Sequence, residues 1–202
     1  MNFDEALVID LETTGLTSGV NEIIEIAILH VRFKPDNSYD VLNKFHSLAR
    51  PLKPALINPK AMEKNGITKE MLAEAPLLQE VRGDLTEWWE DCLSGKVCMI
   101  LGHNFQGFDK GFLTLTLGEA YKKMFDYHAE DTWAVAKFLQ RKGLIPQEVG
   151  LSLDPLTEYF EIPLQAHRAL DDCYGTATLY SKFFSYDRQY PNIKPHTIAI
   201  NK

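Results

Sequence analysis

An apolar run that ends in acidic and turn-forming residues opens the chain. The segment Ala6 to Leu16 reads ALVIDLETTGL. Side chains of a strand alternate between its two faces, so Asp10 and Glu12 share one face with Val8, while the intervening apolar residues share the other. Two carboxylates side by side repel each other, and a divalent cation relieves that repulsion. The segment therefore predicts a strand that carries two ligands for a hard cation such as Mg²⁺ or Mn²⁺.

The remaining pattern predicts two more strands and then a change of order. Residues 21–33 and 42–48 read as strands separated from the first only by turns, which favours an antiparallel meander. From there on, helical spacing and short apolar runs alternate. The expected elements are helices at 59–65, 78–92, 132–142, 152–160 and 167–186, with a buried strand at 97–101. This switch predicts an α/β domain with a mixed sheet.

Composition is typical of one soluble globular domain, expected at 1–186, followed by a tail at 187–202. Of the 202 residues, 45% are hydrophobic, and no apolar run approaches the ~20 residues of a membrane span. We expect a cytoplasmic protein without membrane contact. Its three cysteines lack metal spacing and read as buried free thiols. A formal charge of −7 disfavours broad, non-specific binding to duplex nucleic acid.

More polar residues follow the later elements at regular points. Gly102-His103-Asn104 comes directly after the buried strand at 97–101, and Asp109 opens the next helix. Ligands of α/β folds usually bind at the carboxyl ends of such strands. His167 and Asp172 stand at the entrance of the last helix, where the helix dipole stabilises negative charge. Taken singly, each has a structural explanation as a cap or a core residue.

Taken together, the three motifs DLETTG, GHNFQGFD and HRALDD resemble the DnaQ-like exonucleases of the DEDDh group, which includes proofreading exonuclease subunits, ribonuclease T and oligoribonuclease. The resemblance implies an RNase H-like fold, with a five-stranded mixed sheet flanked by helices. It also implies 3′ to 5′ hydrolysis of a nucleic acid end to nucleoside 5′-monophosphates.

The resemblance assigns roles residue by residue. The four metal-binding carboxylates match Asp10, Glu12, Asp109 and Asp172. His167 matches the histidine that defines the group, because four residues separate it from Asp172. The residues expected to contact substrate are Thr13, Thr14, Gly15, Leu16 and Asn104, with Phe105 proposed to stack on a base. Asn65 replaces the histidine of the family's usual His-Gly-Ile-Thr, and we interpret it as structural.

Phosphodiester hydrolysis explains this residue set. It requires a nucleophile, neutralised phosphate charge and a stabilised leaving oxygen, which two Mg²⁺ or Mn²⁺ ions about 4 Å apart can supply. We expect Asp10, Glu12 and Asp172 to hold one ion. Asp10 and the substrate phosphate should hold the second ion, which Asp109 reaches through water. His167 is expected to act as general base, and Leu16 as a wedge against the terminal base.

Alternatives remain open from the sequence. The substrate is expected to be the 3′ end of single-stranded DNA, because the motifs are closer to the proofreading branch, while an exoribonuclease acting on RNA ends or short oligoribonucleotides is the alternative. A catalytically silent module that binds nucleic acid or a polymerase, and a metal hydrolase of free nucleotides, are the rival classes. A polymerase or a second copy of the chain is the expected protein partner.

Overall fold

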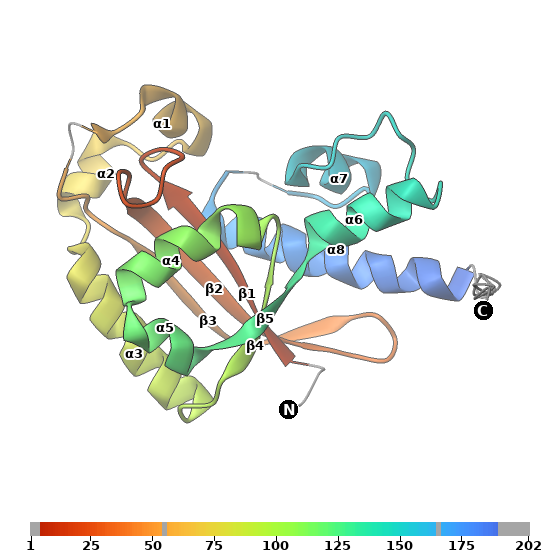
Figure 1. Ribbon diagram of the computed structural model, residues 1–202, viewed down its shortest axis with the longest axis horizontal. Coiled ribbons are helices and arrows are strands. Elements are labelled where there is room, and N and C mark those ends of the chain that lie inside the picture. Colours follow the sequence, from red (N-terminus) through yellow and green to blue (C-terminus); the bar gives the residue numbers. More distant parts are fainter. Residues whose placement is uncertain (1–4, 54–55, 165–166, 190–202) are drawn as a thin grey trace, which may run out of the picture.

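A five-stranded mixed sheet lies at the centre of the computed structural model, which describes residues 5–53, 56–164 and 167–189 (Figure 1). The strands are β1 (Glu5–Thr13), β2 (Ile23–Phe33), β3 (Tyr39–Leu48), β4 (Cys98–Gly102) and β5 (Phe125–Asp131). They lie in the order β3-β2-β1-β4-β5. The first three strands form an antiparallel meander, whereas β4 and β5 run parallel to β1. The predicted mixed sheet is confirmed.

Helices cover both faces of this sheet. They are α1 (Pro59–Asn65), α2 (Lys69–Glu74), α3 (Leu78–Leu93), α4 (Asp109–Leu117), α5 (Glu119–Met124), α6 (Thr132–Arg141), α7 (Leu153–Tyr159) and α8 (Ala169–Gln189), with a 3-10 turn, η2 (Phe105–Gly107), before α4. Within the described ranges, no helix combines the length and the apolar character needed to cross a bilayer.

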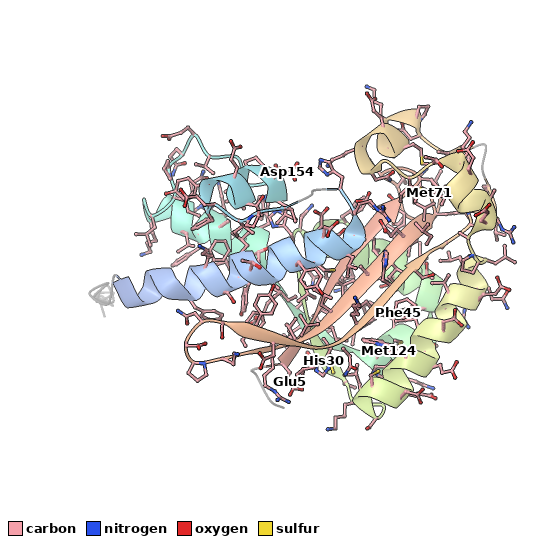
Figure 2. The ribbon with its side chains drawn as sticks, turned by 180° about the vertical axis from the view of Figure 1, so that it is seen from behind. Glu5, His30, Phe45, Met71, Met124 and Asp154 are labelled. Carbon is pink, nitrogen blue, oxygen red and sulfur yellow. The ribbon has the colours of Figure 1, made fainter. Side chains whose placement is uncertain are left out.

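The alternation predicted for β1 divides the core into two layers. Leu7, Ile9 and Leu11 are buried on one face, together with side chains of α3, α4 and α5. On the other face, Ala6 and Val8 contact the long helix α8, which crosses the sheet in the view of Figure 2. α6 and α7 add a third cluster against the outer part of α8. Asp10 and Glu12 therefore lie on the α8 side of the sheet.

Local capping explains where several helices begin and end. The Asn58 side chain accepts a hydrogen bond from the Lys60 amide, Pro59 takes the first position of α1, and Gly66 ends it with φ 66°. Asp131 caps α6 by accepting from the Trp133 amide. These starts and stops are confirmed as predicted.

Several elements differ from the sequence pattern. β5 was not predicted from periodicity, because FDYHAED alternates too little and only Phe125 is buried. The last helix continues to Gln189 instead of ending at 186. The rest of the predicted tail, residues 190–202, lies outside the described residues.

Candidate active site

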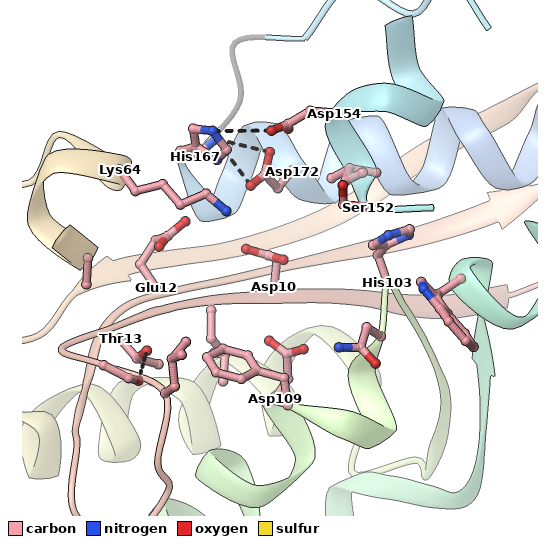
Figure 3. Close-up of a pocket in the computed structure, with 18 residues that line it drawn as sticks. Asp10, Glu12, Thr13, Lys64, His103, Asp109, Ser152, Asp154, His167 and Asp172 are labelled. Atoms are coloured by element: carbon pink, nitrogen blue, oxygen red, sulfur yellow. Dashed lines mark hydrogen bonds and ion pairs between the residues drawn. The ribbon is translucent and has the colours of Figure 1, made fainter. Parts of the chain in front are cut away.

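A cavity of about 410 Å³ opens where β1 and β4 end (Figure 3). Because these strands are parallel, their carboxyl ends meet at the same edge of the sheet, where α/β folds usually bind ligands. All five residues predicted to be catalytic line this cavity, namely Asp10, Glu12, Asp109, His167 and Asp172. Three segments far apart in sequence supply them: β1, the start of α4, and the entrance and first turn of α8.

Three of the carboxylates form one compact group. Asp10, Glu12 and Asp172 each offer an oxygen, and these oxygens lie within 4.8 Å of one another. Asp109 is the first residue of α4 and is only 4% exposed. It lies on the other side of Asp10 from Asp172 (Figure 3). Three of the four predicted carboxylates thus lie close enough together to bind one ion, whereas Asp109 lies apart from that group.

The electrostatics of this group favour a cation. Burial raises the pKa of Glu12 to about 7, although a hydrogen bond from Asn65 opposes the shift. Burial and the charge of Glu12 raise the pKa of Asp172 to about 7 as well. Burial and the charges of Asp109 and Asp172 raise the pKa of Asp10 well above its usual value. A divalent ion would relieve this repulsion and displace the protons, so the donor set fits a hard cation.

Few positive charges face these acids. Among the described residues that line the cavity, Lys64 is the one lysine or arginine. Its charge lowers the pKa values of Glu12 and Asp172, but less than burial raises them. The protein alone therefore leaves the carboxylates short of positive charge.

His167 is held at the entrance of α8 by two acids. Its backbone has φ 72°, and its amide donates to both oxygens of Asp172 at 3.3 Å. Its Nε2 lies 3.3 Å from Asp154, at the start of α7. The other histidine of the cavity, His103, has both ring nitrogens engaged, by the Thr132 hydroxyl and the Leu151 carbonyl. His103 is therefore held by the protein through both ring nitrogens, whereas the ion pair with Asp154 engages one ring nitrogen of His167.

A buried ion pair that sequence reasoning missed supports this end of α8. Glu25 on β2 is fully buried, and its carboxylate accepts hydrogen bonds from Arg168, His46 and the Ala169 amide. Burial opposes its ionisation, but the bonds from His46 and Arg168 outweigh burial and lower its pKa to about 2. The sequence does contain a sign of this pair, because Glu25 is the one charged residue in the apolar run IIEIAIL. A carboxylate buried in such a strand needs hydrogen-bonding or charged partners.

Asn65 has a direct contact with the carboxylate group. Its amide nitrogen donates to Glu12 at 3.4 Å, while its oxygen accepts from the Ile67 amide at 3.0 Å. The structural interpretation is therefore only half of its role, because Asn65 also orients a predicted metal ligand.

The predicted substrate contacts divide into two groups. Thr13, Gly15, Leu16 and Asn104 line the cavity. Leu16 is 82% exposed, as a wedge against a base requires. Gly15 has no room for a larger residue, because a Cβ there would lie 2.6 Å from the Asn21 side chain.

Two of the predicted contact residues have buried side chains. Phe105 is fully buried in the core beneath α4, so it has no face free for a base. Thr14 is 1% exposed, and its hydroxyl accepts a hydrogen bond from the Glu22 amide. In both cases the side chain points to the protein interior and stabilises the loop that presents its neighbours.

Comparison with known proteins decides the family. A family model described as "Exonuclease" matches residues 7–180, which contain every one of these site residues. The chain belongs to the exonuclease family. The predicted resemblance is confirmed.

Relatives with related sequences include much larger exonuclease and polymerase chains. The DNA polymerase III PolC-type of Bacillus subtilis is 32% identical over 177 residues, which is 87% of this chain and 11% of that polymerase. The 3′-5′ exonuclease DinG of Staphylococcus epidermidis is 32% identical over 178 residues, which is 88% of this chain and 18% of that protein. The exonuclease domain thus spans less than a fifth of these relatives.

Solved structures confirm the fold. Exonuclease X, solved with 5′ overhanging duplex DNA, superposes with a TM-score of 0.62 at 24% identity, over 91% of this chain and 93% of that one. The nuclease domain of 3′hExo, described as a DEDDh family member and bound to rAMP, superposes with a TM-score of 0.64 at 18% identity. The match covers 91% of this chain and 92% of that one. This chain therefore shares its fold with these two nucleases.

Proposed function

We propose that this exonuclease-family chain removes nucleoside 5′-monophosphates one at a time from the 3′ end of single-stranded DNA. The observation that carries the proposal is the grouping of Asp10, Glu12 and Asp172 within 4.8 Å, with Asp109 and His167 in the same cavity. The relative DinG, which is named a 3′-5′ exonuclease, supports the direction of cleavage.

The carboxylates provide places for two divalent cations, Mg²⁺ or Mn²⁺. Asp10, Glu12 and Asp172 would hold one ion, and Asp109 with Asp10 would hold the other. When bound, such ions neutralise the phosphate charge, activate water and stabilise the leaving oxygen. The raised pKa values of Glu12 and Asp172, about 7, imply that ion binding releases protons and weakens below neutral pH.

His167 would take the proton from the attacking water. Its amide bonds to Asp172 fix the backbone, and the Asp154 carboxylate 3.3 Å from Nε2 holds the ring at the rim of the cavity. The proton leaves for the imidazole as the new phosphorus–oxygen bond forms, and the 3′ oxygen departs. General-base help of this kind contributes roughly 10²- to 10⁴-fold in rate.

Selection of an end, instead of an internal bond, is assigned to the loop after β1. Leu16 projects into solvent at the cavity mouth, where it can block continuation of the strand past the terminal base. A free single-stranded 3′ end is favoured because its last base is already unstacked, which avoids the cost of unpairing.

Oligonucleotide digestion tests the function. DNA and RNA of the same sequence, single-stranded and duplex and labelled at the 5′ end, are incubated with Mg²⁺ or Mn²⁺. We expect a ladder shortening from the 3′ end on single-stranded DNA, abolished by chelator and by His167→Ala, with Glu90→Gln as an active control. Internal cuts, or faster digestion of RNA, would contradict the proposal.

A polymerase is the proposed protein partner. The PolC-type polymerase contains the matched segment within a much longer chain. Light scattering of the purified chain distinguishes a polymerase partner from self-association. We expect a monomer, whereas a stable dimer would favour a second copy of the chain as the partner.

A further inference from the structure

A second cavity adjoins the catalytic one. It measures about 500 Å³ and lies between η2, the end of β5, the start of α6 and Tyr180 of α8. Asn104 and Trp133 line both cavities. These two residues therefore form a ridge with the carboxylate site on one side and the second cavity on the other.

The ridge is rigid. Asp131 accepts hydrogen bonds from the amides of both Asn104 and Trp133, at 2.8 and 3.0 Å. Asn104 has φ 62°, and a Cβ at Gly107 would lie 2.6 Å from its side-chain oxygen, so glycine is what lets that amide lie there. A fixed ridge loses little entropy when a ligand binds.

Trp133, in the first turn of α6, is a large aromatic residue of which 40% is exposed. Its indole offers a broad aromatic surface beside the cavity in which the terminal phosphodiester bond would lie. Base–aromatic stacking requires such a surface and tolerates every base.

The charges around the second cavity favour a base over a phosphate. Glu130 and Asp131 line it, and a phosphate there would be repelled. Glu130 already accepts a hydrogen bond from Tyr180. Lys110 supplies a positive charge next to the second cavity, although it does not line it. Its ammonium group donates a hydrogen bond of 2.8 Å to the side-chain oxygen of Gln106, which does line the cavity. A base can therefore enter while its phosphate stays near Lys110.

We propose that this second cavity is a binding site for an unstacked base of the substrate strand, upstream of the terminal nucleotide, which stacks on Trp133. The occupant is part of the same strand whose 3′ end would lie at the carboxylates, because the two cavities are neighbours that share Asn104 and Trp133. The proposal rests on the proposed nuclease function and adds where the rest of the strand is held.

Substrates of different length test the site. The p-nitrophenyl ester of thymidine 5′-monophosphate contains one nucleoside and no upstream base, whereas an eight-residue oligothymidylate supplies upstream bases. Trp133→Ala should lower kcat/KM about 10-fold on the oligonucleotide, within the range of one stacked base, and lower it by a clearly smaller factor on the ester, because Trp133 also lines the catalytic cavity. Trp133→Phe should restore most of the loss. Phe138→Ala is the matched control, since Phe138 is 55% exposed on the same helix but lines neither cavity.

An abasic scan locates the base. Oligonucleotides with one abasic position, moved stepwise from the 3′ end, should show one upstream position at which the missing base lowers kcat/KM of the wild type about 10-fold. At that position the missing base should not lower kcat/KM of Trp133→Ala any further. Equal loss by Trp133→Ala on the ester and the oligonucleotide, or an unchanged abasic profile, would overturn the proposal.

A binding measurement separates this proposal from the nuclease function. Anisotropy of the 5′-labelled oligonucleotide, with Ca²⁺ in place of Mg²⁺, should show about 10-fold weaker binding by Trp133→Ala and near-normal binding by Trp133→Phe. Catalytic failure of the wild type would contradict the function alone. Unchanged binding by Trp133→Ala would contradict the stacking site alone.

Discussion

Two glutamates face each other on neighbouring strands and behave in opposite ways. Glu12 of β1 and Glu25 of β2 are register partners. The pKa of Glu12 is raised to about 7, whereas that of Glu25 is lowered to about 2. Both carboxylates experience burial, which raises the pKa, so burial does not explain the difference.

Hydrogen-bonded partners explain it. Glu25 has Arg168, His46 and the Ala169 amide, while Glu12 has Asn65 and the more distant charge of Lys64. A carboxylate satisfied by the protein is structural; one left short of positive charge can accept an ion from solution. The comparison supports the proposed role of Glu12 as a metal ligand, whereas Glu25 anchors the start of α8.

Removing the Glu12 charge should have the largest effect on activity. Glu12→Gln keeps the size of the side chain but loses a ligand charge, so we expect a loss of roughly 10²- to 10³-fold in kcat. Steady-state digestion of 5′-labelled single-stranded DNA measures it. Glu90→Gln, an exposed glutamate on α3, should retain full activity, and equal loss by both variants would contradict the assignment.

Removing the ion pair between Arg168 and Glu25 should mainly lower the stability of the fold. Arg168→Ala leaves Glu25 buried without its main partner, and we expect a loss of about 2–4 kcal/mol in the free energy of unfolding. This is less than for a fully buried pair because the Arg168 side chain is 34% exposed. Urea denaturation measures it.

The double variant sharpens this result. Combining Arg168→Ala with Glu25→Gln removes the unpaired charge and should recover part of the lost stability. Strictly additive losses in the double variant would show that the pair does not anchor α8.

The pH dependence of the chelated protein follows from the unsatisfied carboxylates. Glu12 and Asp172 have pKa values of about 7 when folded, against ordinary values of 4.5 and 3.8. The folded state therefore holds more protons between pH 4 and 7, and its stability falls as pH rises through that window. We expect Tm to drop by about 5 °C from pH 5 to pH 8.

Mg²⁺ should reverse this trend. Ion binding replaces the protons, so millimolar Mg²⁺ should raise Tm at pH 8 and do little at pH 5. Differential scanning fluorimetry measures both. A Tm that rises with pH in chelator would show that the carboxylates are already satisfied by the protein.

Loss of the Asn65 contact should have the smallest effect. Asn65→Ala removes a long hydrogen bond of 3.4 Å to Glu12, so we expect divalent-ion affinity to fall by about 10-fold at most. Calorimetric titration with Mn²⁺ measures it. Asn65→His should bind more tightly than Asn65→Ala if a donor to Glu12 is what matters, and identical affinities would mean that Asn65 acts only through the Ile67 amide.

Much of this site could be predicted because its residues carry local signals. The alternation around Asp10 and the caps at Asn58 and Asp131 depend on neighbouring residues alone, and the three motifs indicated five positions that the structure brings together in one cavity. Tertiary partners could not be predicted in this way. Arg168 and Glu25 are far apart in sequence, and only the packing of α8 on β2 shows that they pair.

Side-chain direction in short loops was the other limit. Phe105 follows a buried strand in a polar motif, where an exposed and a buried orientation leave the same sequence pattern. A Cβ at Gly102 would lie 2.6 Å from the Phe105 side chain, so this glycine provides the space that draws the ring into the core. No periodicity signals such a contact.

Manganese binding tests the central claim most directly. The account predicts that wild type binds two Mn²⁺ ions in equilibrium titrations followed by electron paramagnetic resonance, that Glu12→Gln loses at least one of them, and that Glu25→Gln keeps both. Full binding by Glu12→Gln, or loss of the ions in a folded Glu25→Gln variant, would contradict the division of the two glutamates into ligand and anchor.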